Sequence, residues 1–421
     1  MADRTVTRTY RARVRNHSQV RDDLDSLGFA ASKLWNVARW TVGRVWDACG
    51  QIPSAFDLQK YLKSHERYAD LHSQSSQRVL AELGEAFTAW YGHRGNGNQN
   101  ANPPGYRKHR DEHPRSTVTF KQAGFKHDAA NDRIRLSKGK NLKDGWSDFI
   151  LCEYDVIGPR GTTVENVQQV RAVYEHGVWR LHIVCRVDME VAEPPGDRTA
   201  GVDLGICNVA AVSFGDESLL YPGGSLKEDE YYFAKKRAKC DNLFSREARR
   251  LDRKRTDRRT HFFHTLSKEI VEQCAERGVG TVFVGDLGGI RDGDGGPKNW
   301  GRHGNLDLHG WAFDRFTTML TYKAEMQGIA VETVSERDTS KTCSVCGTKA
   351  DSQRVERGLY DCDECGTVAN ADTNGAENIR QKSTSESIED RSNGWLAQPA
   401  VRLFDKTRGG FLPREQAIRE P

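Results

Sequence analysis

The sequence predicts a protein of the α/β class that also carries a β-barrel-type domain, and three observations support this prediction. With 421 residues, the chain is long enough for two or three domains. Its first half begins and ends with stretches rich in β-forming residues, and has helical spacing between them. Its second half alternates short apolar strands with long amphipathic segments, which is typical of an α/β domain.

The β-barrel-type domain is expected to consist of two separate parts of the chain. Residues 1–18 contain a partly alternating stretch and supply its first strand. The remainder of the domain, 111–195, contains several alternating stretches, with His176-Gly177 as the turn between two of its strands. The Pro-Pro-Gly sequence at 194–196 then marks a linker to the second half.

A helical insert, residues 19–110, separates these two parts. Apolar residues recur every three or four positions in 19–48 and again in 55–92, which is the spacing of amphipathic helices. Glycine, proline and asparagine dominate 95–105, so this stretch is predicted to be a loop. We therefore expect a helical module set into the β-domain.

The second half opens with a strand, a tight turn and another strand at 199–213. A long polar helical region follows at 226–277, and then an apolar strand at 281–287. A glycine-rich loop leads to an amphipathic helix at 307–328 and to a further strand at 329–335. This order predicts a sheet whose strands are connected by helices.

These elements make up the first part of an α/β domain, residues 196–341. A small module with four cysteines, 342–368, interrupts the domain, and the last helix, in 369–382, completes it. Residues 383–421 are polar with scattered proline and glycine, which is typical of a loosely ordered tail.

Four of the ten cysteines have the spacing of a zinc ribbon. Cys343 and Cys346, then Cys362 and Cys365, form two C-x-x-C pairs separated by fifteen residues. A glycine follows each pair and relaxes the turn that brings two thiolates toward one metal. Four thiolates complete a tetrahedral shell, so we expect a structural Zn²⁺. The other cysteines are expected to be reduced and mostly buried; they are Cys49, Cys152, Cys185, Cys207, Cys240 and Cys274.

Charge and hydropathy narrow the class of protein. The net charge of +4 says little, but the stretch 235–259 carries twelve basic residues against four acidic ones. Such a run is either a solvated helix face or a surface for phosphates. No apolar run approaches the ~18 residues of a membrane span, and the start has no signal-peptide core. We expect a cytoplasmic, nucleoid-associated protein without a membrane partner, and no feature predicts its oligomeric state.

Four acidic residues lie where predicted strands or helices end. Asp203 and Asp286 end apolar strands, Glu336 follows the next strand, and Asp372 precedes the last helix. Each of the three aspartates has an ordinary alternative: a turn aspartate for Asp203 and Asp286, and a helix N-cap for Asp372. Their joint order is nevertheless that of an RNase H-like fold, which gathers three or four carboxylates at one end of its sheet. Such carboxylates can hold the Mg²⁺ or Mn²⁺ ions that phosphodiester cleavage requires.

Three stretches resemble the TnpB-type (OrfB-like) proteins of bacterial and archaeal insertion sequences, which are compact RNA-guided relatives of CRISPR type V effectors. They are 201–206, parts of 311–347, and 362–379, within a resemblance that covers about 5–380. The resemblance implies that the β-domain and its insert hold a guide RNA and the guide–target duplex. It also implies that the second half is a RuvC-like nuclease domain that cuts double-stranded or single-stranded DNA with Mg²⁺ or Mn²⁺.

One position departs from this family. The family usually has Glu-Asp-Leu at the end of the second acidic strand, whereas this chain has Gly285-Asp286-Leu287. Asp286 could take over, although successive strand residues face opposite sides. Alternatively, Glu336 could supply the missing carboxylate from the end of the neighbouring strand. A third interpretation is a nuclease-inactive site.

Recognition of a guide RNA and its target requires basic residues on phosphates, because base pairing rather than the protein supplies the sequence specificity. Each basic residue taken alone could be an ordinary surface residue. The candidates are Arg8, Arg11, Arg13, Arg107, Lys108, Lys235, Lys236, Arg250 and Lys254.

Other classes of function explain less of the sequence. A plain zinc-ribbon DNA-binding regulator would explain the cysteines and the basic run but not the acidic strand ends. A strand-transfer transposase of the His-hydrophobic-His type is disfavoured, because no such triplet occurs and two residues separate His261 from His264. An RNA-guided DNA-binding repressor without cleavage stays open because of Gly285.

Overall fold

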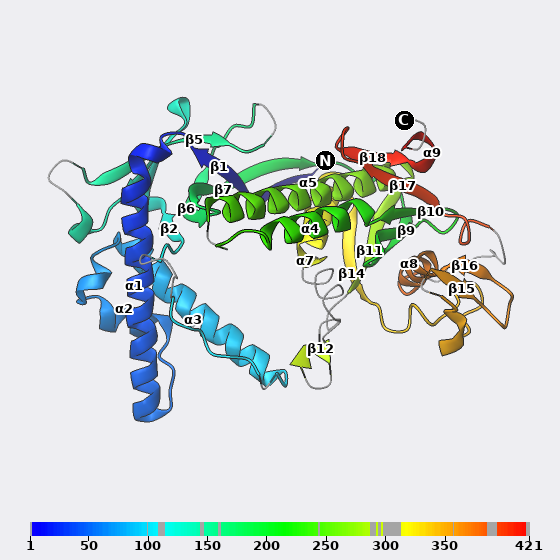
Figure 1. Cartoon of the computed structure of the whole chain (residues 1–421), viewed down its shortest axis with the longest axis horizontal. Helices are drawn as coiled ribbons and strands as arrows, with labels where there is room; N and C mark the ends of the chain where they lie inside the picture. Colours follow the sequence, from blue (N-terminus) through cyan, green and yellow to red (C-terminus); the bar gives the residue numbers. More distant parts are fainter. Residues whose placement is uncertain are drawn as a thin grey trace. The chain divides into compact units, whose positions relative to one another are not determined.

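The computed structural model describes residues 2–98, 100–107, 114–143, 147–158, 161–242, 245–286, 292–293, 296–297, 313–356, 358–384 and 394–417. The chain divides into two compact units (Figure 1). One unit is Thr5–Asp188, and the other is Met189–Pro421 together with Met1–Arg4. Most of the predicted glycine-rich loop and the start of the predicted helix at 307–328 lie outside the described residues.

The unit Thr5–Asp188 is built on a seven-stranded sheet in the order β2-β6-β7-β1-β5-β4-β3. The end strands β2 and β3 are consecutive in the chain and only the short 3-10 turn η2 (Gln122–Gly124) separates them, so the sheet is nearly closed. A nearly closed sheet agrees with the expected β-barrel-type domain. The strands are β1 (Ala2–Val14), β2 (Val118–Lys121), β3 (Phe125–Asp128), β4 (Arg133–Ser137), β5 (Phe149–Val156), β6 (Val167–Glu175) and β7 (Val178–Val191).

Three helices follow β1 in the segment where helical spacing occurs: α1 (His17–Cys49), α2 (Ala55–Leu62) and α3 (Ser73–Gly95). Their apolar stripes join the core of the sheet, in which Leu24 and Leu34 of α1 and Leu83 of α3 are fully buried. Asp25 of α1 accepts hydrogen bonds from Arg115 and from the indole of Trp179 on β7, both at 2.7 Å. A polar anchor therefore fixes the long helix on the sheet.

The second unit contains another seven-stranded sheet, in the order β14-β11-β8-β9-β10-β17-β18. Strands β8, β11 and β14 run parallel, whereas β8, β9 and β10 form an antiparallel meander. The strands are β8 (Arg198–Leu204), β9 (Asn208–Ser213), β10 (Ser218–Pro222), β11 (Val279–Asp286), β14 (Ala330–Ser335), β17 (Ala400–Asp405) and β18 (Gly410–Pro413).

Helices cover both faces of this sheet. On one face, α5 (Arg246–Glu276) and α7 (Phe313–Met326) bury a core that includes Phe263, Leu266 and Phe316. Helix α4 (Gly224–Arg237) runs beside α5 (Figure 1). On the other face, α8 (Ala371–Gln381) packs across β8, β9 and β11. This arrangement positions the start of α8 near the ends of the central parallel strands.

The interrupting module contains a short hairpin, β15 (Leu359–Asp361) and β16 (Val368–Asn370). Its small core consists of Cys343, Tyr360 and Cys362, and it also includes Leu396 from the C-terminal segment. Two short pairs of cysteines and one hairpin bury little apolar surface, so a module of this size ordinarily needs a metal.

The C-terminal segment differs from the expected loose tail. Residues 400–417 form β17, β18 and α9 (Arg414–Ala417), and β17 pairs in parallel with β10. Phe404 and Phe411 pack against Phe262 of α5, with ring centroids 5.0 and 5.5 Å away. The prediction of a loosely ordered tail was wrong for these residues, because the segment is mostly polar and only a few aromatic residues, such as Phe404 and Phe411, fix it on the core.

None of the helices within the described residues has the length and apolar character needed to cross a bilayer.

Candidate functional site

Two of the predicted acids meet at one edge of the second sheet. Val202 of β8 pairs with Val284 of β11, so Asp203 stands beside Gly285. Strand β14 pairs with the other side of β11, and Glu336 follows directly after its last residue. Because these strands run parallel, their carboxyl ends lie at the same edge, where functional groups of α/β sheets commonly gather.

A side chain at residue 285 would collide with Glu336 as it is placed here. A Cβ atom at Gly285 would lie 2.1 Å from Oε1 of Glu336, a distance that no pair of such atoms tolerates. The Glu336 carboxylate therefore occupies the space that a side chain at 285 would need. The carboxylate of Asp203 lies close to Gly375 of α8 in the same way, since a Cβ atom at Gly375 would lie 2.7 Å from its Oδ2.

Asp372 lies in the first turn of α8, but it is not the N-cap. The N-cap is Asn370, whose side chain accepts from the N–H groups of Asp372 and Thr373 at 3.1 and 3.2 Å. The alternative interpretation of Asp372 as a capping residue is therefore wrong. Its carboxylate instead accepts a hydrogen bond of 2.8 Å from Asn208 and lies 3.5 Å from the guanidinium of Arg354.

The carboxylates act on one another electrostatically. Burial, and then the charges of Glu336 and Asp372, hold the pKa of Asp203 well above its usual range, with Arg354 opposing them. Burial, and then Asp286, raise the pKa of Glu336 to about 7, with Lys382 opposing. Oε1 of Glu336 is buried and has no hydrogen-bond partner. Carboxylates that raise one another's pKa, one of them with an unpaired buried oxygen, fit the hard oxygen ligands that Mg²⁺ and Mn²⁺ prefer.

Asp286 has a different position. It is exposed at the end of β11 and pairs with Ser335, one step beyond Gly285, so its side chain starts from the opposite face of the sheet. It acts on Glu336, whereas the charges that act on Asp203 are those of Glu336, Asp372 and Arg354. The geometry therefore favours Glu336 over Asp286 as the partner of Asp203.

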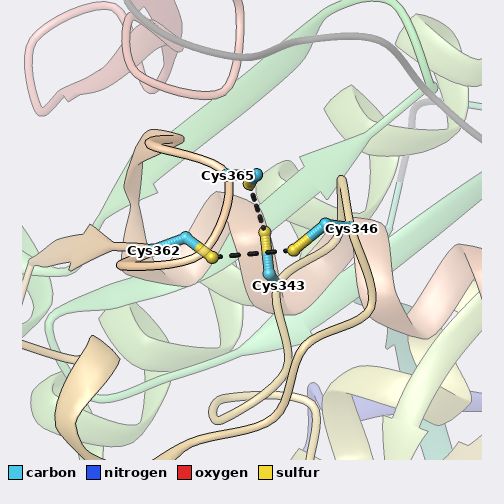
Figure 2. A group of neighbouring side chains, drawn as sticks. All are labelled: Cys343, Cys346, Cys362 and Cys365. Atoms are coloured by element: carbon cyan, nitrogen blue, oxygen red, sulfur yellow. Dashed lines mark hydrogen bonds between the residues drawn. The ribbon is translucent and has the colours of Figure 1, made fainter.

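The four cysteines of the two pairs converge on one point (Figure 2). The Sγ atoms of Cys343 and Cys365 are 3.7 Å apart, and those of Cys346 and Cys362 are 3.6 Å apart. A tetrahedral zinc with Zn–S bonds of about 2.3 Å places its sulfurs roughly 3.8 Å apart. All four sulfurs lie within 4.8 Å of one another. The cluster could therefore hold a metal such as zinc.

The backbone around the cysteines is arranged for such a metal. In each pair the N–H of the first cysteine donates to the carbonyl five residues later. Gly347 and Gly366 have φ values of 75° and 71°, which favour glycine. No second group of histidine, cysteine and acidic ligand atoms this close together occurs among the residues that the structure describes, so the carboxylates are more widely spaced.

The remaining cysteines fit the expectation only in part. Three of them are buried, and burial raises the pKa of Cys152 and of Cys274 to about 12. Cys49 and Cys207 are exposed, and Cys240 is intermediate. None of the six belongs to the metal cluster.

The basic candidates of the first unit have varied surroundings. Arg13 is exposed and Arg8 is half-buried. Arg11 donates to Glu175 at 2.6 Å, so its charge is already paired. Arg107 stacks 3.9 Å above the ring of Trp35 and pairs with Glu82 at 3.3 Å. The remaining candidate of this unit, Lys108, lies outside the described residues.

The basic run of the second unit divides into two sets. Arg255 and Arg259 both bind the buried Glu230 of α4, and so join α4 to α5. The four candidates of this run are exposed to solvent, and Arg250 also lies 3.8 Å from Glu247; they are Lys235, Lys236, Arg250 and Lys254.

Sequence reasoning missed several residues around the sites. Asn208 and Arg354 hold Asp372, and nothing in their local sequence indicates this. In the first unit, a cavity of about 530 Å³ is lined by four arginines, of which only Arg107 was a candidate. The others are Arg78, Arg115 and Arg171. Only the fold brings these arginines together, since they lie in α3, in a loop and in β6.

Comparisons with known proteins show which proteins this chain resembles. The family model OrfB_IS605, described as a probable transposase, matches residues 182–291, and the Cas12f1-like TNB domain matches 313–379. The TnpB-like protein ORF457 of Acidianus two-tailed virus is 27% identical over 361 residues, which cover 76% of this chain and 75% of that protein. The CRISPR-associated endodeoxyribonuclease Cas12f1 of Sulfoacidibacillus thermotolerans is 34% identical over 116 residues, 28% of this chain and 25% of the relative.

A solved structure shows the same fold. In the cryo-EM structure of the Cas12f1-sgRNA-target DNA complex, the protein aligns with a TM-score of 0.56 and 16% identity. The alignment covers 86% of this chain and 82% of that one. The fold is therefore of the Cas12 and TnpB type. Together, the two family models, the long match to a TnpB-like protein and this shared fold make the chain a TnpB-type relative of the CRISPR type V effectors.

Proposed function

We propose that this chain is an RNA-guided DNA endonuclease of the TnpB type, belonging to a transposable element, with an RNase H-like (RuvC) nuclease domain. The observation that carries the proposal is the position of Asp203 and Glu336 at one edge of the sheet, with the charge of Asp372 acting on Asp203 from α8. The names of relatives support it, since one is called TnpB-like and another an endodeoxyribonuclease.

The residues around this site would have different roles in DNA cleavage. Asp203, Glu336 and Asp372 would hold Mg²⁺ or Mn²⁺, which, when bound, supplies a Lewis acid for the scissile phosphate and lowers the pKa of a water molecule. Asn208 fixes the Asp372 carboxylate by donating to Oδ2. Arg354 adds a positive charge beside the same carboxylate, where a DNA phosphate would approach.

The four-cysteine module, residues 342–368, would act as a zinc ribbon. Its chain leads from Glu336 into the first cysteine pair and ends directly before Asp372. A zinc held by Cys343, Cys346, Cys362 and Cys365 would therefore stiffen the segment between two catalytic acids. From this position the ribbon would help to present single-stranded DNA to the carboxylates.

Guide RNA and target DNA are the proposed partners of both units. A relative of the same fold was solved with single-guide RNA and target DNA. The exposed Lys235, Lys236, Arg250 and Lys254 supply positive charge on α4 and α5 for phosphates. In the first unit, Arg13 is the exposed one among the described candidates.

The test is Mg²⁺-dependent cutting of a guide-matched plasmid by the complex of the full chain with the RNA that copurifies with it. We expect wild type and Asp286→Ala to cut, and Asp203→Ala, Glu336→Ala and Asp372→Ala to lose at least about 100-fold in rate. Unchanged cutting by Glu336→Ala would refute its role as the second acid. Absence of a discrete copurifying RNA would refute the guided class.

The inactive alternative is decided by the same experiment. If wild type binds the guide-matched DNA without cutting it in Mg²⁺ or Mn²⁺, the protein is an RNA-guided DNA-binding repressor. Gly285 alone does not favour this outcome, because the place of its missing side chain is taken by a carboxylate.

A further inference from the structure

The segment that carries Glu336 has no regular secondary structure, yet one side chain holds it on both sides of that residue. Lys382, at the end of α8, donates from Nζ to the carbonyl of Ser335 at 2.6 Å and to the carbonyl of Arg337 at 2.7 Å. These two carbonyls flank Glu336 in the chain. The ammonium group therefore bridges the backbone immediately before and after the acid.

Other side chains of α8 hold the rest of the same segment, 336–344. Asn378 donates to the carbonyls of Thr339 and Thr342 at 2.8 and 2.7 Å. Asn374 donates to the carbonyl of Thr342 at 2.8 Å and accepts from the N–H of Ser344 at 2.9 Å. Positions 374, 378 and 382 are four residues apart, so they lie along one face of the helix. This face therefore satisfies carbonyl groups of the segment in addition to the hydrogen bonds of its own turns.

The carboxylate end of Glu336 has no comparable support. Its Oε1 has no hydrogen-bond partner, and the space around it is provided by the missing side chain of Gly285. The location of the carboxylate is therefore set from the backbone side. Within the segment, the N–H and the hydroxyl of Thr339 donate to the carbonyl of Glu336 at 3.1 and 2.8 Å, which closes a local turn. The two contacts of Lys382 are the ones that tie the backbone on either side of Glu336 to α8.

We propose that Lys382 is a positioning residue, which holds the Glu336 segment on α8 so that the carboxylate stands over Gly285 beside Asp203. The inference rests on the proposed nuclease function, since it concerns the same site. Lys382 itself is exposed and would touch neither DNA nor metal in this role. Helix α8 would then set the distance between its own Asp372 and Glu336.

The test compares Lys382→Met, which keeps the length of the side chain but removes its donors, with Lys382→Arg, which keeps the charge and the donors. Lys341→Met is the matched control, because Lys341 lies in the same segment but pairs with the side chain of Asp351. The first readout is hydrogen exchange of the amides in 335–342 without divalent metal. The others are target binding, the cutting rate and the Mg²⁺ concentration for half-maximal cutting.

We expect Lys382→Met to speed exchange in 335–342, to raise the half-maximal Mg²⁺ concentration and to slow cutting roughly 10- to 100-fold, with unchanged target binding. Lys382→Arg and Lys341→Met should resemble wild type. Unchanged exchange in Lys382→Met would overturn the proposal, as would normal cutting. If wild type does not cut, the nuclease proposal fails, and the exchange measurement alone then supports or overturns the role of Lys382.

Discussion

Missing side chains determine where the acids of this site stand. At Gly285 and Gly375 the place of a Cβ atom is taken by an oxygen of Glu336 and of Asp203, respectively. A catalytic group is usually described by the atoms that surround it. Here the places of Glu336 and Asp203 depend as much on two positions at which a methyl group would collide with them.

The first prediction concerns Gly285→Ala. The added methyl group would displace the Glu336 carboxylate, so we expect cutting to slow at least about tenfold while guide RNA and target binding persist. The control is Gly224→Ala, because a Cβ at Gly224 has no atom within 4 Å. Cutting at the wild-type rate by Gly285→Ala would show that Glu336 is not held at this place during catalysis.

The second prediction concerns Glu175, the partner of Arg11. The pKa of Glu175 is lowered from 4.5 to about 2. The neighbouring His182 is the largest cause, Arg11 adds to it, and burial opposes both. A pKa that is lower in the folded state stabilises the fold above pH 4.5, and this stabilisation is lost as the pH falls from 4.5 toward 2.

We therefore expect Glu175→Gln to lower the free energy of unfolding by about 1–2 kcal/mol at pH 7, and by about half as much at pH 3. Urea unfolding followed by tryptophan fluorescence at both pH values measures this difference. The exposed Glu165 provides the control variant Glu165→Gln. A loss that is the same at both pH values would contradict the assigned pKa.

At the scale of elements, periodicity predicted the helices and strands that are long and regular. The helical spacing of 19–48 corresponds to α1, and the apolar strands around Asp203 and Asp286 correspond to β8 and β11. The strand β10 and the pair β17 and β18 were missed, because they are short and do not alternate clearly. Local sequence also cannot show which distant segments pair, and this pairing places β17 next to β10.

Those parts of the candidate site that follow from local sequence patterns could be predicted. The cysteine spacing predicted their convergence, and the strand ends predicted two of the acids. The contacts made by Asn208, Arg354 and Lys382 were not predictable, because they join segments that are far apart in the chain. Single polar residues at the ends of strands and helices, or between them, carry no periodicity that would reveal such partners.

The third prediction concerns the four-cysteine module. We expect the purified protein to contain about one zinc ion per chain, and Cys362→Ser to lose most of it, because three thiolates bind far more weakly than four. Elemental mass spectrometry measures the content, and limited proteolysis within 342–368 should become faster in the variant. The exposed Cys207, changed to serine, is the control. Full zinc content in Cys362→Ser would contradict the assignment.

At the scale of the whole molecule, the fourth prediction concerns salt. Exchange of Lys235, Lys236, Arg250 and Lys254 for glutamine removes four exposed charges from α4 and α5. If they contact phosphates, the slope of log Kd for RNA against log salt should become shallower by about 1–3, since each contact releases roughly one counterion.

The matched control exchanges lysine for arginine, and arginine for lysine, at the same four positions and keeps the charge. The slope is measured by fluorescence anisotropy at salt concentrations from about 50 to about 300 mM, a range over which phosphate contacts change the affinity strongly. An unchanged slope in the glutamine variant would mean that this surface faces solvent in the complex.

The last strands of the chain have a consequence for anyone who wishes to make the protein smaller. Strand β17 covers one side of β10, and Leu396 lies within the core of the cysteine module. A chain that ends at Lys382 would leave one edge of β10 without its partner strand, and unpaired strand edges promote aggregation. It would also remove Leu396 from the core of the cysteine module. Shortening of the protein should therefore begin elsewhere, because these last strands complete the sheet of the second unit.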